Sequence, residues 1–460
     1  MTEAKSSASG TQARSSGGGP AGKDTADRRL RQLVWLYAAL LVLEGALRKW
    51  VLPGLSDPLL LVRDPVVLLA YAIALANGRF PLNRYVVSGA ILMVLYGALT
   101  AFFGHGDPFV TLFGIRANFL HFPFAFIIGR VFYADDVVRL GRWWLWGALP
   151  MTGIIVLQFY SPQSAWINLS VGGIEGGGFS GALGRYRPPG TFSFIVGVTL
   201  YYTLATGFLV AGLTQHQRYS KTLLALAGAA ILLAIPVSIS RSLILTAGLT
   251  FAFGLFPSAF RGGAVMRYLR VGAIILVAGF LVMQLPAFRE AKEAFLARWE
   301  RSTGEERGGF EEAILGRVLY MFYGPFTESR EVPIVGYGIG AGTQVGAKLL
   351  TGERGFDLGE SEWFRIIGES GRVLGGLFIL WRVALCFKLG THSALALARG
   401  NGLGLIFLST TAFNLLTGQL GQTTVNGFTV LGVGLTIASM RIRQKPQQTS
   451  DDESAHKGQT

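Results

Sequence analysis

Residues Lys221–Phe260 read KTLLALAGAAILLAIPVSISRSLILTAGLTFAFGLFPSAF, and this stretch decides the fold class. Its only polar break is the run Ser238–Ser242 (SISRS). Each side of the break approaches the roughly 20 residues that a helix needs to cross a lipid bilayer. The stretch therefore predicts two membrane-spanning helices that are joined by a tight hairpin.

The composition of the whole chain predicts the same class of protein. Of its 460 residues, 51% are hydrophobic and only 15% are charged, and the mean hydropathy is +0.44. A soluble globular protein carries about 25% charged residues. The deficit excludes a soluble enzyme, a disordered chain and a protein with a single membrane anchor. We therefore expect an all-α, polytopic integral membrane protein.

The apolar runs recur along the chain and predict about twelve spanning helices. These helices are expected at residues 33–47, 59–76, 86–103, 110–132, 142–160, 190–210, 221–238, 240–257, 268–286, 366–388, 400–418 and 423–440. The predicted organisation is a disordered tail over 1–32, nine spans within 33–286, a large loop over 287–365, three spans within 366–443 and a second disordered tail over 444–460.

The net charge of +14 is distributed as a topology signal and not as a nucleic-acid surface, so no nucleic-acid partner is expected. If the N-terminus is cytoplasmic, the basic residues of the short loops all fall inside. They are Arg79, Arg84, Arg139, Arg142, Arg218, Lys221, Arg261, Arg267, Arg270, Lys388, Arg399, Arg441, Arg443 and Lys445. This pattern predicts an even number of spans, with both tails in the cytoplasm and the loops 161–189 and 287–365 outside.

The large outer loop contains two amphipathic patterns. In FREAKEAFLARW (288–299), Phe288, Phe295 and Trp299 share one helical face, and FEEAILGRVLYMF (310–322) has a similar apolar face. Two compatible interpretations remain: helices that lie on the membrane surface, or a lid over a site at the outer face.

Arginines at the outer ends of spans are the candidate binding residues. Inserting a guanidinium into the bilayer costs at least about 2.5–3.5 kcal/mol, so such a residue is expected to have a partner. Arg63 has Asp64 beside it, and Glu44 is placed to pair with Arg48. Arg185 lies in a loop and is expected to be solvated or bound to a lipid headgroup. Three further outer arginines have no acidic neighbour in the sequence and form a candidate site for a phosphate-type anion: Arg116, Arg187 and Arg241.

Glu360 and Glu362 precede the tenth predicted span. They fit a general base, a divalent-cation site or a solvated helix start. No Asp-x-Asp pair and no histidine cluster occurs, so neither a metal nor a cofactor is expected, and Cys386 is the only cysteine, which excludes an intramolecular disulfide.

Three segments carry a resemblance to a known family. They are RPPGTFSFIVGVTLYY (187–202), SISRSLILTAGL (238–249), and GYGIGAGTQVG (336–346) followed by ESEWFRIIGESGRVLGGLF (360–378). In this order the segments resemble the O-antigen ligase and O-antigen polymerase superfamily of bacterial membrane glycosyltransferases. The resemblance covers about residues 185–385 and includes the large outer loop.

The resemblance implies a GT-C-like fold in the bacterial inner membrane, with an active site that faces the periplasm. The donor would be an oligosaccharide on a polyprenyl diphosphate, and the acceptor a sugar hydroxyl. By position, Arg187 and Arg241 would bind the donor diphosphate, with Arg116 as a companion, so that no metal is required. Other polysaccharide-assembly proteins would be partners.

The chain departs from the family at the base. The family typically has a histidine about nine positions before the glutamate that corresponds to Glu369, and here that position is Glu360. We therefore expect Glu360, with Glu362 as its substitute, to take the proton of the acceptor hydroxyl. The alternatives are a transporter or flippase of lipid-linked glycan, and a relative that has lost the chemistry.

Overall fold

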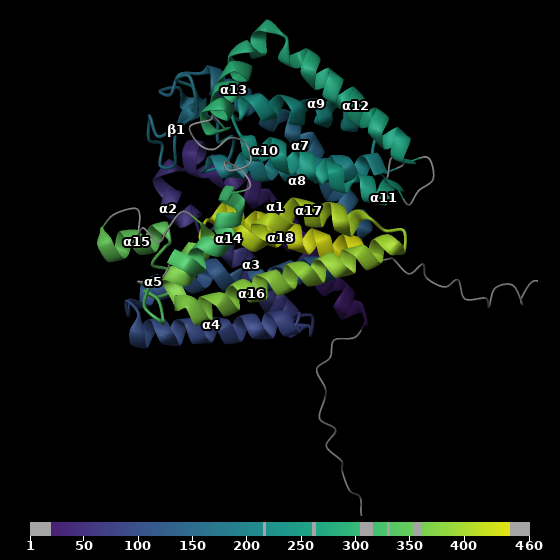
Figure 1. Cartoon of the computed structure of the whole chain (residues 1–460). Coiled ribbons are helices and arrows are strands. Elements are labelled where there is room, and N and C mark those ends of the chain that lie inside the picture. Colours follow the sequence, from purple (N-terminus) through teal and green to yellow (C-terminus); the bar gives the residue numbers. More distant parts are fainter. Residues whose placement is uncertain are drawn as a thin grey trace, which may run out of the picture.

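Helices make up nearly all the regular structure of the computed structural model, which describes residues 20–214, 218–259, 264–303, 316–328, 332–352 and 361–441 (Figure 1). The α-helices are α1 Pro20–Ala46, α2 Ser56–Leu59, α3 Asp64–Ala76, α4 Arg84–Phe103, α5 Pro108–Ile115, α6 Phe122–Val131, α7 Ala134–Tyr160, α8 Ile195–Thr214, α9 Lys221–Val237, α10 Arg241–Phe253, α11 Leu255–Ala259, α12 Ala264–Met283, α13 Arg289–Thr303, α14 Arg317–Glu328, α15 Gln344–Thr351, α16 Glu362–Ala398, α17 Leu403–Thr417 and α18 Thr423–Met440.

Five shorter helical turns connect them: η1 Leu47–Val51, η2 Pro53–Leu55, η3 Arg116–Leu120, η4 Trp166–Asn168 and η5 Pro286–Phe288. In the part of the chain that the structure describes, the only strands are β1 Phe179–Ser180 and β2 Tyr186–Arg187, which pair antiparallel.

Each of the twelve segments that the sequence predicts as spans contains helical residues, but some are interrupted: residues 60–63 and 190–194 are not helical, and the chain reverses at Gly371 within 366–388. Within the described ranges, eight helical segments have the length and apolar character to cross a membrane, and a ninth counts if α12 and α13, bent by 85°, form one broken span. The helices α9 and α17 have only 17 and 15 residues. The chain is thus an all-helical, membrane-embedded protein.

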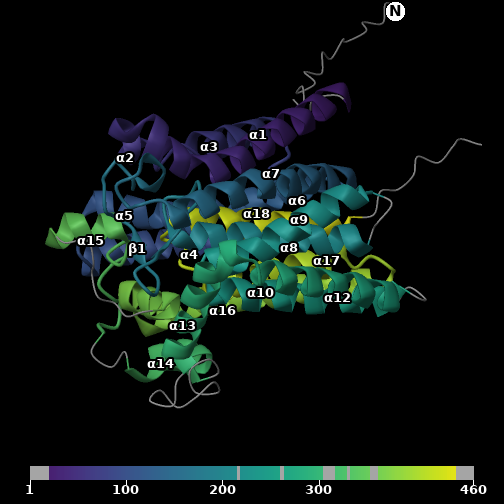
Figure 2. The ribbon, with the colours of Figure 1, turned by 90° about the horizontal axis from the view of Figure 1, so that it is seen from above.

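The two ends of the helical bundle differ in character (Figures 1 and 2). One end carries the β-hairpin, α2 and α15; α1 begins and α18 ends at the other. At the latter end the basic residues make short contacts between helix termini. Arg79 pairs with Asp27 at 3.0 Å, and Arg218 pairs with Asp135 at 3.1 Å. Arg79 and Arg218, two of the basic residues that the sequence pattern places inside, therefore lie at this end.

Helix α18 lies in the middle of the bundle, and its small residues explain how it packs there (Figure 2). A Cβ at Gly434 would lie 2.6 Å from Ile128, and one at Gly432 would lie 2.6 Å from Thr411. Small residues allow neighbouring helix backbones to approach closely in membrane proteins. The Gly- and Thr-rich composition of the last span is thus a packing feature.

Two predicted boundaries are corrected. Helix α1 begins at Pro20, so residues 20–32 are helical although the sequence pattern predicts a disordered tail. Burial of Leu30 and the ion pair from Asp27 hold this extension on the bundle. Helix α8 begins at Ile195, five residues after the predicted start, because 190–194 form a turn. The predicted tail over 444–460 lies outside the described residues.

The element α16 is a helical hairpin and not one straight rod. Gly371 interrupts it with φ 73° and ψ 174°. A straight helix would separate residues 362 and 382 by about 30 Å, yet Arg382 Nη1 lies 3.0 Å from the Oε1 atom of Glu362. A Cβ at Gly375 would also lie 3.1 Å from the carbonyl oxygen of Ile366. Residues 362–370 therefore fold back along the helix that follows Gly371.

Of the two amphipathic helices predicted in the large loop, the first is confirmed as α13. Its face with Ala291, Ala294 and Phe295 is buried, and Phe295 and Trp299 are in ring contact. The second pattern is confirmed only in its last part, where α14 places Phe322 against Trp363 with 4.9 Å between ring centroids. Residues 304–315 lie outside the described residues.

Candidate functional site

Arg187 belongs to β2 of the β-hairpin. The hairpin lies at the end of the bundle opposite to the start of α1 and the end of α18 (Figure 1). Arg187 stands opposite Phe179 in the ladder, and the amide of Gly181 donates to the carbonyl of Arg185 at 2.9 Å. Between them, Leu183 has φ 52° and Gly184 has φ 73°, the left-handed backbone of a tight turn. The guanidinium therefore extends from a fixed backbone and not from a long open loop.

A tight turn between α9 and α10 positions Arg241. Ile239 has φ 49° and is fully buried, and Ser240 accepts the amide of Leu243 at 3.3 Å as the cap of α10. Ser240 also bonds to Thr199 of α8 at 3.0 Å. Arg241 is the first residue of α10, so this short hairpin holds it at the same end of the bundle as the β-hairpin.

Helix α13 adds a third arginine that the sequence analysis missed. Arg298 donates to the carbonyl of Gly181 at 3.3 Å, so α13 lies on the β-hairpin. A second contact ties the same two elements, because Arg185 pairs with Glu290. Arg298 falls within the helix whose apolar face predicts a lid, but its partner in the hairpin is more than a hundred residues away and leaves no local signal in the sequence.

The three arginines act on one another electrostatically. Burial is the largest cause that lowers the pKa of Arg187, and together with the positive charges of Arg298 and Arg241 it brings that pKa to about 10. Among the described residues, no carboxylate pairs with Arg187, and its Nε atom is buried without an acceptor. A bound anion would relieve both the repulsion and the unmet hydrogen bond. This arginine cluster, Arg187, Arg241 and Arg298, is the candidate anion site.

Arg116, the third predicted anion ligand, has a carboxylate of its own. It pairs with Asp64, and its Nη2 atom donates to the Oδ1 atom of Asp64 at 3.0 Å and to the carbonyl of Leu60 at 3.2 Å. His121 Nε2 lies 2.8 Å from the same Oδ1 atom. The charge of Arg116 is thus neutralised within a buried polar network of α3, η3 and the start of α6.

Of the two neighbouring ion pairs that the sequence predicts, one is present in the structure. Glu44 pairs with Arg48 at 3.5 Å, as predicted. Arg63 does not pair with Asp64 in this structure: its Nε atom lies 3.1 Å from Glu44, and its Nη2 atom donates to the carbonyl of Thr423 at 2.6 Å. Arg116 takes the place at Asp64 because η3 brings it there from 52 residues away.

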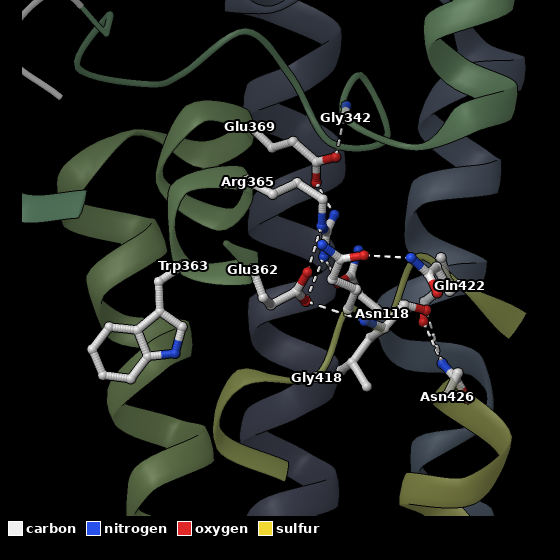
Figure 3. A network of polar contacts seen from close by, with 12 residues as sticks. Asn118, Gly342, Glu362, Trp363, Arg365, Glu369, Gly418, Gln422 and Asn426 are labelled. Atoms are coloured by element: carbon white, nitrogen blue, oxygen red, sulfur yellow. Dashed lines mark hydrogen bonds and ion pairs between the residues drawn. The ribbon is translucent and has the colours of Figure 1, made fainter. Parts of the chain in front are cut away.

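Glu362 belongs to a second buried network at the start of α16 (Figure 3). Its carboxylate lies 2.8 Å from Arg365 and 3.0 Å from Arg382, and it also accepts the amide of Leu420 at 3.3 Å. Arg365 in turn binds Glu369 at 2.7 Å and Asn118 at 2.9 Å. The Glu362 carboxylate is thus bound by two guanidinium groups and one backbone amide. Glu360, the other predicted base, lies outside the described residues.

The glycine-rich segment 336–342 packs against this network. The amide of Gly338 donates to the carbonyl of Glu369 at 2.9 Å, and the amide of Gly342 donates to the Glu369 carboxylate at 2.9 Å (Figure 3). Gly336, Gly338 and Gly340 all have positive φ, which residues with side chains rarely adopt. The backbone of this segment therefore packs tightly against the α16 hairpin.

Within the described ranges, no group of three or more His, Cys, Asp or Glu side chains is arranged to hold a metal ion. Comparison of the chain with protein-family models, with curated proteins and with solved structures finds no match.

Proposed function

We propose that this protein is a bacterial inner-membrane glycosyltransferase that polymerises or ligates cell-envelope polysaccharide. The observation that carries the proposal is the arginine cluster, in which three elements far apart in the sequence bring Arg187, Arg241 and Arg298 together and Arg187 has no carboxylate partner among the described residues. Planar guanidinium groups bind paired phosphate oxygens well. The ligand would be the diphosphate of a polyprenyl-linked oligosaccharide.

In the proposed reaction, a hydroxyl oxygen of the acceptor sugar attacks the anomeric carbon of the donor sugar. The bond from that carbon to the diphosphate oxygen breaks, a base takes the hydroxyl proton, and polyprenyl diphosphate leaves with the bonding electron pair. The arginine cluster would stabilise the negative charge that develops on the leaving oxygen. The turns that carry these arginines have fixed backbones, which would hold the guanidinium N–H donors in place during the reaction.

The proposal assigns the base to Glu360. Glu362 is bound by Arg365, by Arg382 and by the amide of Leu420, so it has little freedom to accept a further proton. We assign to Glu362 the role of positioning the α16 hairpin. Polymerase is preferred over ligase because the acceptor region departs from the ligase pattern, and the cluster would face the periplasm with both chain ends in the cytoplasm.

The test is reconstitution of purified protein in liposomes with a polyprenyl-diphosphate oligosaccharide. Release of polyprenyl diphosphate with a longer lipid-linked glycan indicates a polymerase, and release with glycan on another acceptor indicates a ligase. Arg187→Ala and Arg241→Ala should abolish release while the protein stays inserted. Arg289→Gln is the matched control, because Arg289 on α13 is 80% exposed and pairs only with Glu293 among the contacts of the described residues. Full activity of both alanine variants would refute the proposal.

A second candidate function is transport of lipid-linked glycan. It is favoured by the buried ion pairs within or at the ends of spanning segments, such as Glu44 with Arg63 and Asp64 with Arg116, since intramembrane charges often mark transport pathways. Movement of an intact fluorescent lipid-linked glycan across the liposome, without release of polyprenyl diphosphate, would identify this function. A folded protein that does neither would be a relative without the chemistry.

A further inference from the structure

Lys49, at the outer end of the first span, has a buried amine that pairs with no carboxylate of the described residues. Its side chain is 1% exposed, and Nζ donates to the carbonyl of Gly190 at 2.5 Å. Its neighbour Arg48 pairs with Glu44, whereas no carboxylate of the described residues pairs with Lys49. The Nζ atom also lies 4.5 Å from the centroid of the Trp50 ring. An ammonium group has three N–H donors, so one carbonyl and one ring face leave part of its hydrogen-bonding capacity unused.

The turn that precedes α8 fixes the backbone carbonyl to which Lys49 donates. Gly190 has φ 59°, and Gln158 clamps it: the amide of Gly190 donates to the Oε1 atom of Gln158 at 2.7 Å, and the Nε2 atom of Gln158 donates to the carbonyl of Gly190 at 3.2 Å. The Nζ atom of Lys49 therefore rests on a rigid carbonyl, three residues from Arg187 in the sequence.

Lys49 and Arg187 line the same pocket, which lies between the outer loop 161–194 and the end of the first span. A third group in its wall is also unsatisfied: the Oε1 atom of Gln163 is buried and, among the described residues, accepts no hydrogen bond. The pocket thus combines two cations with unused N–H groups and one acceptor. Such a set fits an anion that carries a hydroxyl group beside it.

We propose that this pocket binds the sugar-proximal phosphate of the donor together with the first sugar. The phosphate oxygens accept hydrogen bonds from Lys49 and Arg187, and a hydroxyl of the sugar donates to Gln163. This inference rests on the proposed function, which it extends from the arginine cluster to the sugar end of the donor. A phosphatidylglycerol headgroup has the same chemistry, a phosphate with adjacent hydroxyls, so the test must separate the two sources.

The test measures lipid binding to the full-length protein in phosphatidylcholine nanodiscs. The probes are polyprenyl diphosphate, the same lipid with one N-acetylhexosamine, and phosphatidylglycerol. The variants are Lys49→Met and Gln163→Leu, and Lys348→Met is the matched control because Lys348 is exposed on α15 at the same end of the bundle.

Loss of a charged hydrogen bond should weaken binding by about tenfold or more, and loss of a neutral one by less. We expect Lys49→Met to weaken binding of both polyprenyl lipids. Gln163→Leu should weaken only the glycosylated lipid, and it remains informative if Lys49→Met fails to fold. Lys348→Met should change neither.

Unchanged binding in Lys49→Met, or equal losses on both polyprenyl lipids in Gln163→Leu, would overturn the inference. Preference of the wild-type protein for phosphatidylglycerol over the glycosylated lipid would overturn it too and identify a headgroup site. A third outcome separates the two proposals: wild-type protein binds the glycosylated lipid, Arg241→Gln abolishes this binding, and Lys49→Met leaves it unchanged. In that case the proposed function survives without this subsite. Wild-type protein that binds neither polyprenyl lipid would refute the proposed function itself.

Discussion

Arg382 and Glu362 face each other at 3.0 Å although they are twenty residues apart in one helical element. This ion pair exists because the chain folds back at Gly371. It is almost completely buried, and Arg382 also donates to the carbonyls of Leu415 at 2.7 Å and Gly418 at 2.9 Å. One guanidinium thus joins the two halves of the α16 hairpin to the connection between α17 and α18.

Replacing Arg382 with Ala should destabilise the protein by about 3–5 kcal/mol, because Glu362 would keep a buried charge with one of its two arginines missing. The measurement is the thermal unfolding midpoint in detergent. Arg399→Ala, at the exposed C-cap of the same element, is the control and should unfold close to wild type. An Arg382→Ala variant as stable as this control would show that the pair is dispensable.

Gly371→Ala should prevent the hairpin from closing. Gly371 has φ 73°, and a Cβ there would overlap the carbonyl oxygen of Ile334. The control is Gly376→Ala, five residues later, where a Cβ would meet no atom within 4 Å. A helical Gly→Ala change stabilises by up to about 1 kcal/mol. We expect aggregated Gly371→Ala protein and a normal elution profile for Gly376→Ala in size-exclusion chromatography; similar profiles would contradict the role of Gly371.

Arg116→Met should destabilise the protein by leaving Asp64 with His121 as its remaining side-chain partner. The double variant Arg116→Met with Asp64→Asn removes both charges, and it should recover most of the lost stability. If Arg116 acts only on Asp64, the double variant also recovers glycan transfer. Recovery of the unfolding midpoint without recovery of activity would instead show that Arg116 contacts the donor directly.

Anion binding to the arginine cluster should depend on pH through Arg187. Its pKa is lowered to about 10, so Arg187 is protonated at neutral pH and loses its proton as the pH rises through about 10. Binding of sulfate, whose charge is constant over the range, should stay level from about pH 7 to about pH 9 and then fall. Calorimetric titration across this range is the measurement.

Arg241→Gln provides the check on the sign of this effect. Removing one positive neighbour raises the pKa of Arg187, so the decline should move to higher pH while affinity at neutral pH decreases. Arg289→Gln should leave the profile in place. A decline that begins at the same pH in Arg241→Gln and wild type would argue against electrostatic coupling within the cluster.

Local sequence patterns predicted much of the fold and two of the three arginines of the candidate site. Long apolar runs locate helices because each must satisfy its own backbone in the membrane. The isolated charges of Arg187 and Arg241, each beside a turn, were sufficient to propose that they meet. Both belong to short hairpins, whose geometry depends mainly on nearby residues.

What the sequence did not reveal depends on contacts between distant segments. Arg116 finds Asp64 across 52 residues, and Arg298 reaches Gly181 across 117. Arg382 interrupts an apolar run and was a detectable signal, because a charge inside a span needs a partner. Its partner could not be named, since the reversal at Gly371 depends on tertiary packing against the glycine-rich segment 336–342.

The α16 hairpin also constrains the order in which the protein is assembled during translation. The charges of Glu362, Arg365 and Glu369 leave the ribosome before Arg382, and well before the carbonyls of residues 414–418 that bind Arg382. Until those later segments have entered the bilayer, residues 362–370 have only part of their final partners. The hairpin therefore gains its full set of contacts only after α17 has been inserted, so that the last steps of biogenesis, and not the first, complete this part of the protein.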